Sequence, residues 1–168
     1  MELGVNGMSA KAAAPPDVAV WLAQLAEDLG YGSWWVGEHV VLPSPRTTDS
    51  PMAADDPILD PLVHLSYVAA VTTRLQLGTG ILILPQRNPV VLAKQAASLD
   101  YLSGGRLLLG VAAGYLEPEM TAVGVPMADR GTRTDEYIDA MTSLWIDPKP
   151  EFAGRYAAFA AVDAHPRP

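Results

Sequence analysis

Apolar residues along the chain alternate between short continuous runs and stretches with helical spacing. The continuous runs predict strands at residues 2–5, 33–36, 75–84 and 107–111, and the last of these is expected to be fully buried. Apolar residues three and four positions apart predict helices over residues 16–29, 61–72, 89–102 and 134–145. Residues 112–128 are expected to form a loop, and residues 152–162 one more strand or part of a hairpin.

Capping residues mark the ends of several of these helices. Asp60-Pro61 and Asn88-Pro89 each combine a capping side chain with a proline at the first helical position, and Gly30 ends the first helix. The first helix is predicted to bury an apolar stripe made of Val18, Trp21, Leu22, Leu25 and Leu29. The third is predicted to bury Leu92, Ala96, Leu99 and Leu102.

The order of these elements predicts the fold class. Strand and helix alternate about four times, which is typical of right-handed βαβ units that build a parallel sheet. A complete eight-unit barrel takes about 250 residues, so 168 residues fit either a small open sheet or half of a (β/α) barrel. We expect residues 1–168 to form one α/β domain of about four βα units followed by a C-terminal strand fragment.

Charge and residue content argue against several functions. A net charge of −8 without a basic stripe disfavours nucleic acid as a partner, and the absence of cysteine excludes disulfides and zinc–thiolate sites. No apolar run approaches the roughly 18–20 residues of a membrane span, and the N-terminus lacks a signal-peptide pattern, so we expect a cytoplasmic protein. Phosphate-binding loops and the serine elbow of hydrolases are missing, and the histidines are too scattered for a metal motif.

A ligand is expected at the segments that follow the strands, because parallel α/β folds bind at the carboxyl ends of their strands. His39, next to Glu38, follows the second predicted strand and can either exchange protons near neutral pH or bond to a backbone carbonyl. His64 lies inside a helix and is expected to pack or to face solvent. Gly78 and Gly80 weaken the third strand, which indicates either a bulge or a ligand against the main chain.

Several segments together have a familiar pattern: 29–43 with Gly37-Glu38-His39, 77–89 with Gly78-Thr79-Gly80-Ile81, 93–96, 99–110, 124–126 and 130–137. This set resembles the bacterial luciferase-like family, and is most similar to its branch of oxidoreductases that use the deazaflavin coenzyme F420. The likeness runs in one order from residue 3 to residue 162, which makes it specific.

The resemblance implies a luciferase-like TIM barrel with a cofactor ring at the carboxyl ends of the strands, of which this chain is the N-terminal half. It implies an oxidoreductase, or monooxygenase, that transfers hydride between F420 (alternatively FMN) and a small organic substrate. His39 and Glu38 would lie near the ring and handle protonation. A cis peptide bond is implied between Gly80 and Ile81. The residues implied to contact the cofactor are Asn6, Thr79, Gly80, Ile81, Asn88, Gly114 and Tyr115.

Half of a barrel has unpaired strand edges and part of an apolar core exposed. We therefore expect a homodimer or pairing with a complementary half-barrel. The alternative to an enzyme is a non-catalytic truncated half-barrel that acts as an interaction or scaffold protein, or a degenerate fragment. A small open α/β binding module without a redox role is a third hypothesis.

Overall fold

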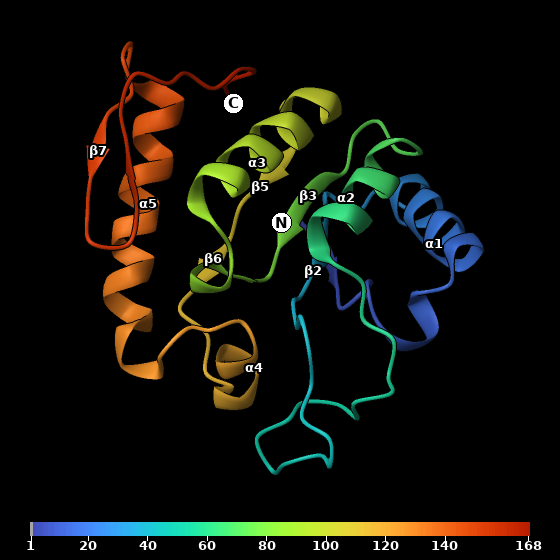
Figure 1. The fold of residues 1–168 in the computed structure, drawn as a ribbon. Helices are drawn as coiled ribbons and strands as arrows, with labels where there is room; N and C mark the ends of the chain where they lie inside the picture. The colour runs from blue at the N-terminus through green and yellow to red at the C-terminus, as the bar shows by residue number, and fades with distance from the viewer. Residues whose placement is uncertain (1) are drawn as a thin grey trace.

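The computed structural model describes residues 2–168, in which parallel strands alternate with covering helices (Figure 1). One parallel sheet contains, in this order, β1 (Gly4–Asn6), β2 (Ser33–Val36), β3 (Gln76–Thr79) and β5 (Leu107–Leu108). In a doubly wound sheet the strand order reverses at a switch point, whereas here each strand adds to the same side of the previous one. Sequential addition is the topology of a barrel, so the partial (β/α) barrel is the architecture observed.

The third and fourth strands each continue beyond a break. After β3 the chain resumes as β4 (Leu82–Ile83), after β5 it resumes as β6 (Val111–Ala112), and β4 and β6 pair in parallel. The Thr79 hydroxyl donates to the Gly110 carbonyl at 2.7 Å and accepts from the Gly110 amide at 2.9 Å, which aligns the two breaks. The prediction of one continuous strand over residues 75–84, and of another over 107–111, was therefore wrong, because each strand is interrupted in its middle. The peptide bond from Gly80 to Ile81 is cis, as the resemblance implied.

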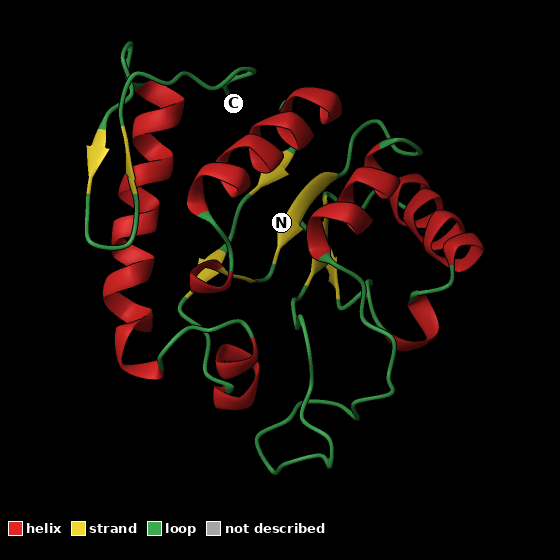
Figure 2. Ribbon diagram, viewed as in Figure 1, coloured by secondary structure: helices red, strands yellow, loops and turns green. Residues whose placement is uncertain are grey.

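The helices that cover the sheet are α1 (Pro16–Asp28), α2 (Pro61–Ala69), α3 (Pro89–Ser103) and α5 (Arg130–Ile146) (Figure 2). The predicted caps are confirmed. The Asp60 carboxylate accepts from two amides at the start of α2 at 2.9 and 3.0 Å. The Asn88 side chain does the same for α3 at 3.0 and 3.2 Å, and Gly104 ends α3 in the left-handed conformation.

Three predictions about burial were wrong. The face of α1 that contacts the sheet carries Ala19, Ala23 and Ala26, whereas Trp21 is 60% and Leu29 68% exposed. The small side chains let the helix axis approach the sheet, so the larger apolar residues lie on the flanks and the outer face. The predicted buried strand 107–111 is only half-buried. The reason is that β5 is the last strand of the sheet among the described residues and pairs with β3 alone. Leu102, at the end of α3, is 78% exposed.

The remaining differences concern element ends. The first strand lies at Gly4–Asn6 rather than at residues 2–5, and α5 begins at Arg130 rather than at residue 134. The predicted loop 112–128 contains a short helix, α4 (Glu117–Ala122). The tail forms a hairpin of β7 (Phe152–Ala153) and β8 (Ala158–Phe159) beside α5, as one of the two predictions had it (Figure 1). Within residues 2–168, no helix combines the length and apolarity needed to cross a bilayer.

Two charged side chains, Glu27 and Arg106, form hydrogen bonds at the end of the sheet where the strands begin. The Glu27 carboxylate accepts hydrogen bonds from the amides of residues 73–75 at 2.6 to 3.1 Å. Burial alone would raise the pKa of Glu27, but these amides outweigh it and hold the pKa below its usual value. The Arg106 guanidinium donates five hydrogen bonds to oxygen atoms of Ala69, Thr72, Leu75 and Ser103. Both residues lie at the end of the sheet opposite the carboxyl ends of the strands, the end that in (β/α) barrels serves stability rather than chemistry.

Replacing Arg106 by lysine tests this role. An ammonium group has three donors and cannot reproduce the planar fork, so some of the carbonyls lose their partner. We expect Arg106→Lys to lower the free energy of unfolding by about 2 kcal/mol, measured by urea denaturation. The matched control is Arg155→Lys, whose side chain is 74% exposed and which should change stability by less than about 0.5 kcal/mol. Equal effects of the two substitutions would contradict the assignment.

Candidate functional site

A cavity of about 610 Å³ opens at the carboxyl ends of the parallel strands. The segments that follow β1, β2, β3 and β6 all contribute to its lining, together with parts of the long connection after β2 and Arg130 at the start of α5. Much of the wall consists of glycine and alanine, so the main chain itself borders the space. This is the position at which parallel α/β folds bind ligands, because loops from several strands converge there.

The cavity brings together most of the residues that the sequence singled out. His39, Gly80 and Ile81 line it, although they follow different strands. Gly114 and Tyr115 line it as well, after β6. The rings of Tyr115 and His39 meet edge to face, with centroids 6.2 Å apart and planes at 89°. An imidazole and the Gly80–Ile81 main chain therefore border one space.

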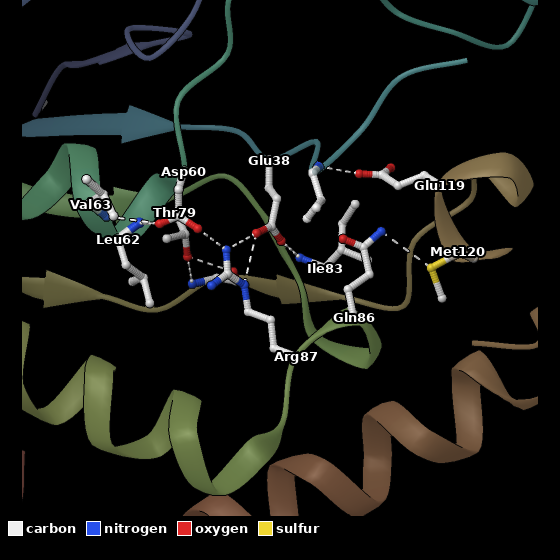
Figure 3. Close-up of polar contacts among 12 residues, drawn as sticks. Glu38, Asp60, Leu62, Val63, Thr79, Ile83, Gln86, Arg87, Glu119 and Met120 are labelled. Carbon is white, nitrogen blue, oxygen red and sulfur yellow. Dashed lines mark hydrogen bonds and ion pairs between the residues drawn. The ribbon is translucent and has the colours of Figure 1, made fainter. Parts of the chain in front are cut away.

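The partner of His39 is a residue that the sequence did not reveal. Nδ1 of His39 lies 2.9 Å from Oε2 of Glu119, whose side chain is 0% exposed. The other oxygen of Glu119 accepts from the Val40 amide at 2.6 Å (Figure 3). Glu119 belongs to α4, in a segment predicted to be a loop, and it is 80 positions from His39. Only the acidic character of residues 117 and 119 was visible in the sequence.

Glu38, implied by the resemblance to handle protonation together with His39, has other hydrogen-bond partners than the imidazole. Its carboxylate accepts from the Ile83 amide at 2.5 Å and from Nε of Arg87 at 2.9 Å (Figure 3). Arg87 also donates to Asp60 at 2.5 Å and so bridges two carboxylates. His39 instead has its contact with Glu119 of α4, so the two neighbouring side chains have separate partners. Glu38 still borders the cavity, but its carboxylate forms an ion pair with Arg87.

The pKa values of the two carboxylates move in opposite directions. Burial raises the pKa of Glu38, and the hydrogen bond and charge of Arg87 only partly offset this effect. Burial also acts to raise the pKa of Asp60, but there the hydrogen bonds from Arg87 and the helix amides dominate and lower the pKa. Glu38 thus depends on its counter-ion more than Asp60 does, because Asp60 is partly solvated.

Three of the residues implied as cofactor contacts have other partners. Thr79 is completely buried, and its hydroxyl is engaged with Gly110 across the strand breaks. The Asn88 amide caps α3. The Asn6 side chain accepts from the Gly7 amide at 2.8 Å, and it is Gly7 that borders the cavity. Among the described residues, no group of three or more His, Asp and Glu side chains is arranged to hold a metal ion.

The fold and the cavity define a partial (β/α) barrel with a ligand site at the carboxyl ends of its strands. The family model described as luciferase-like monooxygenase matches residues 2–168, and the chain belongs to this family. The chain is 34% identical over 172 residues to the F420-dependent glucose-6-phosphate dehydrogenase of Kineococcus radiotolerans, covering 100% of this chain and 48% of that one. An uncharacterised protein of Mycobacterium tuberculosis is 35% identical over 154 residues, which cover 87% and 55% of the two chains.

Solved structures show the same architecture. The monooxygenase RslO1 of Streptomyces bottropensis superposes with a TM-score of 0.82 at 28% identity, over 99% of this chain and 50% of that chain. The chain therefore spans about half the length of the relatives that it matches. The partial barrel read from the strand order agrees with this comparison.

Arg87→Met tests the buried bridge. Removing the guanidinium leaves the Glu38 carboxylate buried without a counter-ion, so we expect a loss of about 3 kcal/mol in the free energy of unfolding at pH 7.5. The pKa of Glu38 is already raised, so this carboxyl takes up a proton as the pH falls and no longer needs a counter-ion. The loss should therefore be smaller at pH 5 than at pH 7.5.

Urea denaturation at the two pH values measures this difference. The double variant Arg87→Met/Glu38→Gln should recover part of the lost stability, because it removes the unpaired charge. Arg46→Met, in the exposed connection after β2, is the control and should have little effect at either pH. A loss for Arg87→Met that grows toward pH 5 would contradict the bridge.

Proposed function

We propose that this chain forms the N-terminal half of the cofactor site of an oxidoreductase that transfers hydride between coenzyme F420, or alternatively FMN, and a small organic substrate. The observation that carries the proposal is that His39 and the Gly80–Ile81 main chain border one cavity at the carboxyl ends of the strands. The names of the relatives add support. One is an F420-dependent dehydrogenase, and a structural neighbour contains FMN.

The cavity fits a flat ring system. A Cβ atom added to Gly37 would make an ordinary van der Waals contact, at 3.7 Å, with the carbonyl oxygen of Gly80, so these two main-chain segments are neighbours at the wall. Together with Ala112 and Ala113 they form a surface without bulky side chains, against which a planar group can lie. Arg130 supplies a cation to the lining, which suits the phosphate groups that both F420 and FMN carry.

The residues of this chain would then have distinct tasks. A bound deazaflavin or flavin supplies the ring atom that accepts or releases hydride. His39 lines the cavity and is the side chain suited to exchange a proton there. The main chain at Gly80 and Ile81 supports the ring, and Tyr115 closes one side of the space against the imidazole. Glu38 accepts from the Ile83 amide and would thereby hold the main chain that follows the Gly80–Ile81 bond in place.

The edges of the sheet support a further part of the proposal. β1 and β5 are the outer strands, and the apolar residues Val5, Leu107 and Leu108 on them are only half-buried. We propose that a second copy of the chain, or a complementary half-barrel, covers these edges. Sedimentation velocity on the purified chain should give a discrete dimer. A monodisperse monomer would contradict the homodimer.

Titration with the two cofactors tests the main proposal. Absorbance and fluorescence of F420, and separately of FMN, should change on addition of the chain and saturate. We expect His39→Gln to weaken binding about fivefold, because one hydrogen bond contributes about 1 kcal/mol. His165→Gln is the matched control, since His165 lies in the exposed tail, and it should bind as the wild type does. Flat titrations with both cofactors would overturn the proposed function.

A further inference from the structure

Glu119 divides its two oxygen atoms between two donors from the loop after β2. Oε1 accepts from the Val40 amide at 2.6 Å, and Oε2 lies 2.9 Å from Nδ1 of His39. The side chain is fully buried, so bulk solvent does not reach either oxygen. Within residues 2–168, the hydrogen bond at Nδ1 is the only one made by the His39 ring. One carboxylate therefore holds both the main chain and the imidazole of this segment.

We infer that Glu119 is a positioning residue that keeps the His39 proton on Nδ1 and leaves Nε2 unprotonated for the ligand. A carboxylate has only acceptor sites, so both groups that touch it must donate. The Val40 amide always donates, and Nδ1 must therefore carry the ring proton. A neutral imidazole has a single N–H, so its Nε2 is an acceptor. The inference rests on the proposed function only in saying that Nε2 accepts a proton or hydrogen bond from a ligand. The position of the proton on the His39 ring follows from the chain alone.

A glutamine at position 119 cannot satisfy both donors. Its amide has one carbonyl oxygen, and its NH2 group only donates. If the oxygen accepts from Val40, the NH2 group faces Nδ1, and His39 must move its proton to Nε2. If the oxygen faces His39 instead, the Val40 amide is left buried opposite another donor, and a buried donor without an acceptor is costly. The first arrangement is the less costly one, so Glu119→Gln should exchange the roles of the two ring nitrogens.

The chain contains its own reference for this measurement. It has three histidines, at positions 39, 64 and 165. Nε2 of His64 lies 3.2 Å from the indole nitrogen of Trp34, which can only donate. His64 is therefore also expected in the Nδ1–H tautomer, independently of position 119. His165 is exposed in the tail.

Nitrogen-15 NMR of the histidine-labelled chain, recorded at alkaline pH where imidazoles are neutral, tests the inference without any cofactor. His64→Gln and His165→Gln variants assign the signals. We expect His39 in the wild type to show a protonated Nδ1 and an unprotonated Nε2, and Glu119→Gln to reverse this pattern. Glu117→Gln, on the exposed side of the same helix, should leave all three histidines unchanged.

Two results would overturn the inference. One is a wild-type His39 with its proton on Nε2, and the other is a Glu119→Gln variant that keeps the proton on Nδ1. If Glu119→Gln does not fold, the inference is tested by the wild type alone, through whether the proton of His39 lies on Nδ1 or on Nε2. The cofactor titrations are a separate measurement, so flat titrations with the expected tautomer would reject the proposed function and leave the role of Glu119 intact.

Discussion

The cavity depends on one contact between two strand breaks. The Thr79 hydroxyl both donates to and accepts from the main chain of Gly110, and the Gly110 carbonyl also accepts from the Leu82 amide at 2.9 Å. A Cβ atom at position 110 would lie 2.3 Å from the Thr79 carbonyl oxygen, so only glycine permits this approach. Because the breaks are held in register, β4 and β6 pair again beyond them, and the main chain at Gly80 is left bordering the cavity.

Much of the fold could be predicted from the sequence because its signals are local. An Asx residue before proline specifies a helix start within a few residues, and both such starts, at Asp60 and Asn88, are confirmed. Burial depends instead on what lies across the interface. The apolar stripe through Trp21 suggested the wrong face of α1, since alanines allow the closer approach. Gly78 was interpreted as a bulge or ligand signal, but a Cβ atom there would lie 2.2 Å from the Trp35 ring.

The candidate site was predictable only where it follows directly from strand ends. His39, Gly80 and Gly114 come just after strands, and parallel strands bring their carboxyl ends together, so position alone indicated the cavity. Glu119 and Arg87 could not be found in this way. They are 80 and 49 positions away from the residues that they bind, and Glu119 depends on a short helix without a clear sequence signal.

The pair Glu38-His39 illustrates how adjacency in sequence misleads. The resemblance implied that the two handle protonation together near the ring, yet in the structure they have different partners. Glu38 contacts Arg87, while His39 borders the cavity and contacts Glu119. Each of the two side chains thus has a partner of its own. Glu38 is paired with Arg87 at the cavity wall, and the imidazole contacts Glu119, which among residues 2–168 has no lysine or arginine partner, so a change at one pair should leave the other in place.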